Sequence, residues 1–432
     1  MALSFYGIPL LEEAMQNWQS LSEFRRERTR NKNYTFGRQW CDVISVNGRR
    51  MTEYDYIVSE GSLPLKNNLI RRIVRNVVGV FRRQLAEKME GWSESLQQIA
   101  AHNRMYELLS RTMEEFLISG MAVHKVWHSD GKPVACDSVS PQDFFFDKGA
   151  RDICGRDANL VGQLHDLSFP DYCDAFVHTQ EDYERIATRC NSGEPIRVVE
   201  IWRHERVGRH VYHDSRKGSV IVADDGVKLP REIRSLPSSW HIADVWRYYF
   251  IDSEGRILSS GDSPLPDGGH PFVFKCYPFL DGEIHSFVAD IIDQQRYTNR
   301  LITMYDWIMR ASAKGVLLMP EGAVDPENMQ NVVDQWSRFN GVIVYRPRPG
   351  YPDPKQVSGN ATNIGISELL DIQLKMLEDV SGVNGALQGN LANNSISGTL
   401  YNQQTQNALI SLSDLLDTFA SFISEITTKL TI

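Results

Sequence analysis

Hydrophobic residues recur at helical spacing from Asp281 to Ala313 and predict one long helix. Asp281 is placed to cap its start, and Gly315 follows its end. The apolar positions on the two sides of its middle are Ile284, Phe287, Val288, Ile291, Ile292, Leu301, Met304, Tyr305, Ile308 and Met309. At about 1.5 Å per residue this helix would span about 50 Å. Its middle, residues 293–300, is polar, which indicates that the segments packed along it are not all hydrophobic.

The chain before this helix predicts a body of helices and strands. Amphipathic helices are expected over residues 10–30, 67–87 and 103–119, and a further helix is entered at Phe169. Alternating patterns predict strands over residues 121–127, 134–139, 143–147, 196–204, 207–213, 220–224, 243–252, 257–260 and 272–278, with another from Leu160. Residues 31–62 are expected to be polar loop with short strands. This mixture is typical of an α+β fold.

The pattern changes after the long helix. Short strands are expected at residues 315–319 and 341–345, on either side of a helix over 325–339 that Asp325 and Pro326 begin. A second helix is expected over residues 366–379. The Gly-, Asn- and Ser-rich run from Gly385 to Gly398 cannot pack a core and predicts a mobile loop. A last helix is expected from Thr399 to Ile432.

Two of the predicted helices carry many arginines. The helix over residues 10–30 ends in Arg25, Arg26, Arg28 and Arg30. A solvated helix end, favoured by the helix dipole, is the preferred interpretation, and a contact with nucleic acid or a partner is the alternative. The helix over 67–87 has one apolar stripe with arginines beside it. A core helix is favoured there over a helix lying on a membrane surface.

Net charge, hydropathy and cysteine spacing argue against several classes of protein. The net charge of −9 argues against a protein that simply coats nucleic acid. No segment approaches the roughly eighteen apolar residues of a membrane span, and the first residues lack the basic region of a secretory signal. The six cysteines lie far apart with no C-x-x-C pair, so we expect free thiols in a reducing cytosol.

No phosphate-binding, dinucleotide-binding, serine-hydrolase or zinc-protease motif occurs, and no catalytic residue or cofactor is expected. Two groups of residues have the composition of a metal site. One is a carboxylate cluster for metal-dependent phosphodiester cleavage, comprising Asp147, Asp152, Asp157, His165 and Asp166. Its spacing fits no helix or strand face, and basic residues interleave with it. The other is a zinc site of His204, His210 and His213 in a predicted hairpin, for which ordinary surface histidines are the favoured reading.

The order of elements is the most informative feature. An α+β body leads into a long helix, a small β-α-β insert, a return helix, a Gly/Asn-rich loop and a further helix. From about Asn67 to Ile432 this order resembles the portal (head-to-tail connector) proteins of tailed bacteriophages. The stretches that support the resemblance are KNNLIRRIVRNVVGVF, VSPQDFFFD, DGEIHSFVADIIDQQRYTNRL and NNSISGTLYNQQTQNAL.

The resemblance implies a portal-like α+β fold with a wing, long stem helices, a small clip and little or no crown. Residues 1–66 would be an outer wing segment, 67–280 the wing body, 281–313 the stem helix and 314–361 the clip. Residues 362–380 would be the second stem helix, 381–398 the tunnel loop and 399–432 the C-terminal wing helix. The acid-rich helices after the insert suit a channel lining that lets DNA slide, because clustered Lys and Arg contacts would hold it.

Particular residues follow from the resemblance. The DNA-channel loop would present Asn390, Asn393, Asn394, Ser395 and Ser397. The stem and channel candidates are Asp293, Arg296, Arg300, Arg310 and Lys314. The clip residues expected to dock partners are Glu327, Gln330, Asp334 and Arg338.

The implied function is a ring of about twelve copies at the portal vertex of the capsid, assembled in the bacterial cytoplasm. Double-stranded DNA would pass through it during packaging and ejection. The implied partners are the terminase large subunit, the head-tail adaptor, and the capsid and scaffold proteins, with no membrane, metal or cofactor. Two other classes were kept open: a non-portal adaptor or structural virion protein, and a metal-dependent nuclease that uses the Asp147–Asp166 cluster.

Overall fold

The computed structural model describes residues 7–128, 133–153, 155–189, 194–214, 218–314, 316–319, 326–337, 355–357, 365–383 and 409–432, with residues 131, 324 and 350. The chain divides into two compact units. Unit 1 comprises Met1–Arg38, Leu69–Ile292 and Glu378–Ile432, and unit 2 comprises Gln39–Asn68 and Asp293–Leu377. Helices and antiparallel sheets occur together, so the predicted α+β class is confirmed.

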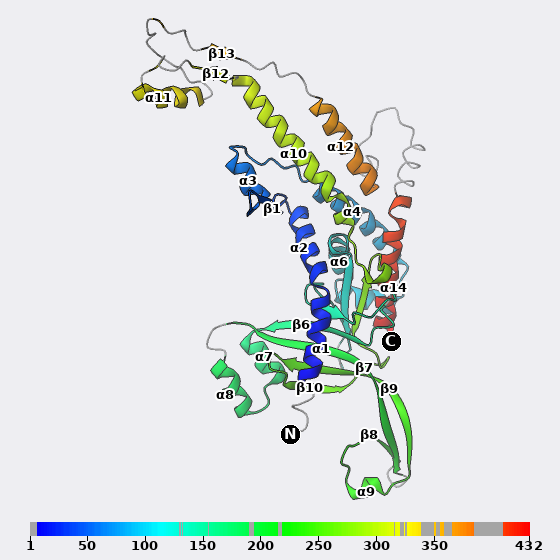
Figure 1. The fold of residues 1–432 in the computed structure, drawn as a ribbon. Helices are drawn as coiled ribbons and strands as arrows, with labels where there is room; N and C mark the ends of the chain where they lie inside the picture. Colours follow the sequence, from blue (N-terminus) through cyan, green and yellow to red (C-terminus); the bar gives the residue numbers. More distant parts are fainter. Residues whose placement is uncertain are drawn as a thin grey trace. The chain divides into compact units, whose positions relative to one another are not determined.

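A six-stranded antiparallel sheet forms the centre of unit 1 (Figure 1). Its strand order is β10-β9-β7-β6-β5, and β8 pairs with β7. The strands are β5 (Phe144–Phe146), β6 (Leu160–Leu167), β7 (Ile196–Asp214), β8 (Ser219–Asp224), β9 (Ser238–Asp252) and β10 (Ile257–Asp262). Side chains alternate across the sheet, so Val199 and Ile201 of β7 join the core on one face, and Trp202 joins the core on the other.

Both faces of this sheet are covered. On one face, α1 (Gly7–Ser20) packs Leu10 and Ala14 against a core that includes Phe145. On the other lies a three-stranded sheet of order β11-β3-β4, formed by β3 (Met121–Trp127), β4 (Ala135–Ser138) and β11 (Phe272–Cys276). Phe144 of β5 meets Phe274 of β11 with ring centroids 5.1 Å apart. The two sheets therefore share an aromatic core.

A helical layer completes unit 1. It includes α2 (Ser22–Thr35), α4 (Leu69–Glu90), α5 (Glu94–His102), α6 (Met105–Ser119) and α14 (Ser413–Thr431). Phe419 of α14 packs against Phe81 of α4 and Phe116 of α6, with ring centroids 5.0 and 5.4 Å apart. The helices α7 (Phe169–Phe176) and α8 (Gln180–Arg189) pack Tyr172 and Ile186 in a separate small core. The last helix of the chain thus packs within unit 1.

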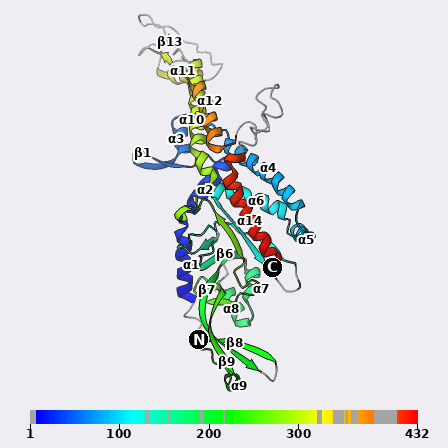
Figure 2. The same ribbon diagram turned by 90° about the vertical axis from the view of Figure 1, so that its right-hand side faces the viewer.

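Figure 2 shows the outer halves of β7 and β9 extending together as a ribbon, with β8 and α9 (Arg231–Arg234) at its end. The prediction of two strands over residues 196–213 is wrong, because β7 runs unbroken from Ile196 to Asp214. His204, Glu205 and Arg206 pair directly with residues of β9. These residues lack the Gly, Pro or Asn that a hairpin turn requires.

Unit 2 contains the segment before α4 and most of the long helix. Its elements are β1 (Val43–Val46), β2 (Arg49–Thr52), α3 (Glu53–Ser59), β12 (Val316–Leu318), α11 (Pro326–Ser337) and β13 (Lys355–Val357). The helices α10 (Phe287–Lys314) and α12 (Ile366–Ser381) each cross the boundary between the units. β12 pairs antiparallel with β13, at residues where the sequence indicated no strand. The second strand expected at 341–345 lies outside the described residues.

The long helix begins later than predicted. Asp281 and Gly282 have φ values of 54° and 84°, and Leu280–Gly282 forms only a short 3₁₀ turn. The helix α10 starts at Phe287, six residues after Asp281, so Asp281 is too far away to cap it. Ser286 does so instead, because its Oγ accepts a hydrogen bond from the Ala289 backbone N–H over 3.0 Å.

Other boundaries also differ from the sequence-based prediction. The helix expected over residues 10–30 is two helices that meet at Leu21, and α5 was not predicted. The helix expected from Phe169 is also two helices, α7 and α8. Cys41, Cys136, Cys173 and Cys276 are free thiols, as predicted. Within the described part of the chain, no helix has the length and hydropathy that a membrane crossing requires.

Candidate functional site

The polar middle of α10 is buried within unit 2. Gln295, Thr298 and Asn299 are each at most 1 % exposed. Asn299 Nδ2 donates to Gln39 Oε1 over 2.8 Å, and Gln295 Nε2 donates to the Asn67 carbonyl over 2.6 Å. Buried amides need such partners, because an unmade hydrogen bond costs the desolvation of the group. The prediction that the partners of this helix are not all hydrophobic is confirmed.

Glu53 is the charged centre of the same region. It is the first residue of α3 and only 3 % exposed. Its Oε1 accepts hydrogen bonds from Arg296 Nη2 over 2.6 Å and from Arg300 Nη2 over 2.5 Å. Arg296 Nε also lies 3.4 Å from Asp42 Oδ2. Two cations expected in the channel are therefore ion-paired within their own unit, and their exposure to DNA stays a prediction.

The sequence analysis did not identify Glu53 as a site residue, because few features of the sequence point to its ion pairs. The local cue is Thr52, whose side chain accepts from the Asp55 N–H and so caps α3. The partner of Glu53, Arg300, is 247 positions away along the chain. No periodicity connects positions so far apart, so only the fold brings them together.

The remaining predicted site residues are placed as follows. Asp293 is exposed on α10. Arg310 and Lys314 belong to α10, but their side chains lie outside the described residues. Glu327, Gln330 and Asp334 are exposed and share one face of α11 at helical spacing. Arg338 lies outside the described residues, as do Asn390, Asn393, Asn394, Ser395 and Ser397 of the predicted tunnel loop.

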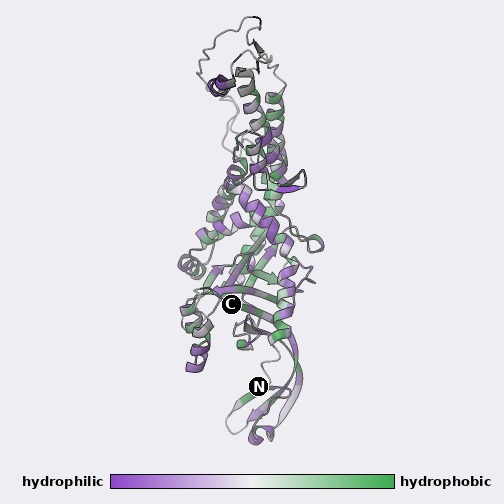
Figure 3. Cartoon of the chain, turned by 60° about the vertical axis from the view of Figure 1, so that its left-hand side comes forward, coloured by the Kyte–Doolittle hydropathy of each residue, from purple (hydrophilic) through white to green (hydrophobic). Residues whose placement is uncertain are grey.

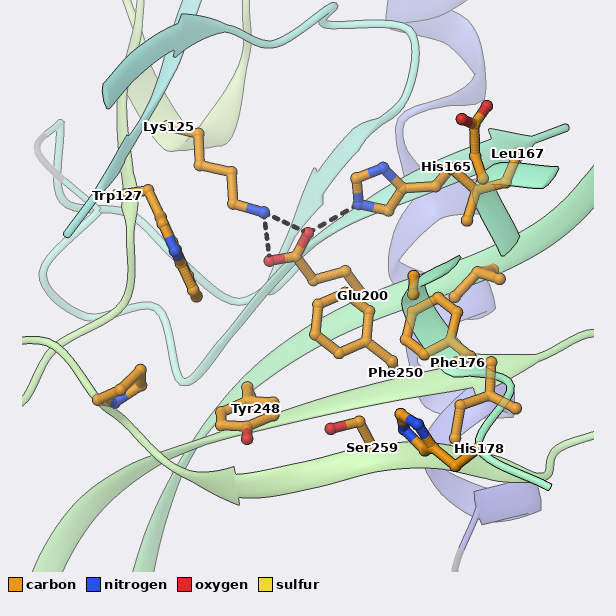
Figure 4. A pocket seen from close by; sticks show the side chains of 15 residues that line it. Lys125, Trp127, His165, Leu167, Phe176, His178, Glu200, Tyr248, Phe250 and Ser259 are labelled. Atoms are coloured by element: carbon orange, nitrogen blue, oxygen red, sulfur yellow. Dashed lines mark hydrogen bonds and ion pairs between the residues drawn. The ribbon is translucent and has the colours of Figure 1, made fainter. Parts of the chain in front are cut away.

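Unit 1 contains a cavity of about 490 Å³ beside the central sheet (Figure 4). Its labelled side chains come from β3, β6, β7, α7, β9 and β10, with His178 from the connection between α7 and α8, and aromatic rings form much of its lining. At one side, Glu200 points between Lys125 and His165. Lys125 Nζ lies 2.7 Å from both carboxylate oxygens, and His165 Nε2 lies 2.7 Å from Oε2.

Glu200 is fully buried and remains charged. Burial alone would raise its pKa, but the hydrogen bond from His165 and the charge of Lys125 lower the pKa to about 2. Trp202 Nε1 also donates to Oε1 over 2.8 Å. A carboxylate so fully hydrogen-bonded has little capacity to take up a proton near neutral pH. The cluster therefore ties β3 of one sheet to β6 and β7 of the other.

The structure does not assemble the alternative carboxylate site for cleavage. Asp147 accepts from the Gly149 N–H, and Asp157 accepts from the backbone N–H groups of Arg151 and Asp152, so both act within turns. Asp166 pairs with Arg197 over 2.8 Å, while His165 pairs with Glu200. Among the described residues, no group of three or more His, Cys, Asp or Glu side chains is arranged to hold a metal ion.

The histidine site is not assembled either. His204 and His210 lie on one face of β7, and His213, an odd number of positions away, lies on the other. His204 Nε2 is 2.9 Å from Asp244 Oδ1, and His210 Nε2 is 3.2 Å from Asp225 Oδ1. The zinc hypothesis failed because it required a hairpin, whereas β7 is one continuous strand.

The arginines near the N-terminus are largely structural. Arg25 is buried with its guanidinium 3.7 Å from the ring centroid of Trp18, and burial lowers its pKa. Arg28 is also buried and pairs with Glu115 of α6 over 2.6 Å. The interpretation as a solvated helix end is therefore wrong for these two residues, because the helix continues to Thr35 and packs inside unit 1.

A family model for the phage P22-like portal proteins matches residues 11–431. The chain belongs to this portal family. The predicted resemblance is thereby confirmed, and the match also includes the N-terminal residues upstream of Asn67. A comparison with curated proteins finds no match. As a member of the portal family, the chain is a phage structural protein of the capsid vertex.

In this portal-family chain, the polar clusters of both units have structural roles. The candidate stem helix α10 is anchored by charge pairs and buried amides to residues 39–68, a segment that sequence analysis assigned to an outer part of the wing. The cavity of unit 1 contains an ion cluster whose carboxylate is fully hydrogen-bonded, in place of a free acid or base.

Proposed function

We propose that the chain assembles into a ring of about twelve copies and conducts double-stranded DNA into the capsid during packaging and out of it during ejection. The terminase large subunit docks on the clip during packaging, and a head-tail adaptor replaces it afterwards. Capsid and scaffold proteins contact the ring as it is built into the vertex. The protein itself is a passive conduit, and the docked motor supplies the energy.

The observation that carries this proposal is the exposed apolar surface of both stem helices in unit 2. On α10 the exposed apolar residues include Met304, Tyr305, Trp307 and Met309, and on α12 they include Leu369, Ile372, Leu374 and Met376. Figure 3 shows hydrophobic as well as hydrophilic positions along both helices. Exposed large hydrophobic side chains gathered on two helices, here on more than one face of α10, are typical of surfaces that a partner covers. Neighbouring copies in a ring would cover it.

Charge along α12 supports a channel that does not hold DNA. Its sequence has the carboxylates Glu368, Asp371, Glu378 and Asp379 against the single cation Lys375. Cations that neutralise phosphates release counterions and bind DNA firmly, whereas an acidic lining repels the backbone and permits sliding. Asp293, Arg310 and Lys314 of α10 would be the few charged residues that modulate this lining. Arg296 and Arg300, the other two candidates from the sequence, are already paired with Glu53.

Two of the three acidic residues that the sequence offers on α14 already have partners within unit 1. Glu425 pairs with the buried Lys275 over 2.8 Å, and Asp414 accepts from the Tyr277 hydroxyl over 3.0 Å. These carboxylates are used inside unit 1. The electrostatic argument for sliding therefore rests on α12.

The loop and the clip complete the proposal. Residues 381–398, with Asn390, Asn393, Asn394, Ser395 and Ser397, would make weak contacts with phosphates that do not depend on sequence. On α11, the exposed Glu327, Gln330 and Asp334 present one polar face to the motor and the adaptor. Arg338, the fourth residue expected to dock partners, lies outside the described residues.

A charge placed on the exposed apolar surface tests the assembly step. Ile372→Asp puts a carboxylate on a side chain that is 48 % exposed in one chain. We expect it to leave the thermal unfolding of the monomer unchanged but to abolish rings and DNA-filled heads, because the ring interface cannot desolvate the charge. Asp371→Asn, at the neighbouring exposed position, is the control for ring formation. Normal rings from Ile372→Asp would overturn the proposed interface.

A further inference from the structure

A second cavity, of about 310 Å³, lies wholly within unit 2 beside α10. Its apolar lining is formed by Trp40, Ile44, Tyr56, Ile57 and Met304, and its polar groups belong to Glu53, Arg300 and Thr303. A space of this volume, bounded mainly by hydrophobic side chains, suits one aromatic side chain delivered from outside.

The polar groups of this cavity determine which functional group the entering side chain must have. Glu53 Oε1 already accepts from two guanidinium groups, but its other oxygen, Oε2, is buried and receives no hydrogen bond from any described residue. A buried acceptor without a donor costs free energy until a donor arrives. Arg300 is half exposed beside it and can donate to a further oxygen. A phenol, which both donates and accepts, satisfies both groups.

The same helix offers a tyrosine on a different face. Successive residues of an α-helix turn by about 100°, so Tyr305 points about 140° away from Arg300. Tyr305 is 47 % exposed. Thr303, Met304 and Trp307 share the Arg300 face by their spacing of three, four and seven residues. One copy of α10 thus carries the cavity on one face and an exposed tyrosine on nearly the opposite face.

A ring built head to tail needs two different surfaces that complement each other on every copy. We propose that Tyr305 of one copy enters the Glu53 cavity of the next copy, with its ring against Trp40, Ile57 and Met304 and its hydroxyl donating to Glu53 Oε2. This inference rests on the proposed ring. It names the contact by which each copy would recognise its neighbour. The ion pairs of Glu53 with Arg296 and Arg300 hold the receiving cavity in shape.

Disulfide trapping in assembled rings tests the contact directly. The pair Tyr305→Cys and Ile57→Cys, in a Cys41→Ser background, places one thiol on the entering side chain and one in the cavity. We expect mild oxidation of rings to give a ladder of covalent multimers on a non-reducing gel. The control pair, Tyr305→Cys with Val43→Cys, uses an exposed hairpin residue that does not line the cavity and should stay monomeric.

Two single variants keep the inference testable if the cysteine variants assemble poorly. Tyr305→Ala should lower the fraction of chains in rings by about tenfold or more, and Tyr305→Phe, which loses only the hydroxyl, by about threefold to tenfold. Rings that assemble normally with Tyr305→Ala, or that give no ladder with the cavity pair, would overturn the contact but leave the ring intact. A wild-type chain that forms no rings would instead overturn the proposed function.

Discussion

Arg296 Nη2 lies 2.6 Å from Glu53 Oε1, and this ion pair joins the middle of α10 to the first turn of α3. Arg300, one turn further along α10, donates to the same oxygen. Two arginines on one helix face therefore share one buried carboxylate. A basic patch that suggests a DNA contact in the sequence serves first to hold unit 2 together.

Removal of Glu53 should destabilise unit 2. In Glu53→Ala both guanidinium groups lose their shared acceptor in a partly buried site, and we expect the free energy of unfolding to fall by about 2–4 kcal/mol. Denaturant unfolding followed by tryptophan fluorescence measures the change. Asp293→Ala is the control, because Asp293 is 84 % exposed and lies 3.8 Å from Arg296, so its loss should cost less than about 0.5 kcal/mol.

The buried Glu200 should make stability depend on pH. Its pKa falls from the ordinary 4.5 to about 2 in the folded protein, so its charge stabilises the fold above pH 4.5. That contribution, on the order of 3 kcal/mol, should be lost as pH falls from about 4.5 to about 2. Denaturation midpoints across this range measure it.

Glu200→Gln is the matched test of this pH dependence. It should be less stable than the wild type at pH 7 and should lose less stability on acidification, because it has no proton to take up. The exposed Glu232→Gln should follow the wild-type curve. Parallel curves for Glu200→Gln and the wild type would show that other carboxylates dominate the response.

The contact between Lys275 and Glu425 should attach α14 to the three-stranded sheet. Lys275 is 1 % exposed, so Glu425→Gln removes a charged partner from a buried ammonium group. We expect a loss of about 2 kcal/mol in the free energy of unfolding. Asp417→Asn, on an exposed position of the same helix, should change stability by less than about 0.5 kcal/mol. Equal effects from the two variants would contradict the role of the pair.

Deletion of Asn390–Ser397 should separate assembly from DNA handling. If these residues form the tunnel loop, the shortened chain should still give rings but should package or retain less DNA in the head. Particle mass measures the first property, and DNA content per head measures the second. Failure of the ring itself would show that the segment is structural.

Local patterns in the sequence identified the elements that pack by a single stripe. The stripe of α4 is an example, since Ile70, Ile73, Val74 and Val77 are all buried as their spacing indicated. The helix that Asp325 and Pro326 predict between the short strands after α10 is also present, as α11. These features depend on neighbours within a few residues along the chain.

Local sequence patterns could not predict contacts between residues that are far apart along the chain. Arg25 and Arg28 belong to a run that resembles a solvated helix end, yet both are buried, because Trp18 and Glu115 happen to face them in the fold. The length of β7 depends on its partner β9, whose pairing determines whether His204–Arg206 turns or continues. The acceptor of Arg296 and Arg300 likewise depends on a segment far away along the chain.

The mass of the purified protein in solution, followed by images of the particles viewed end-on, tests the central claim most directly. A portal ring should give a mass of about twelve times the 49.3 kDa chain and a ring with a central hole. A monomer or dimer that persists at high concentration and with scaffold and capsid proteins present would contradict the account.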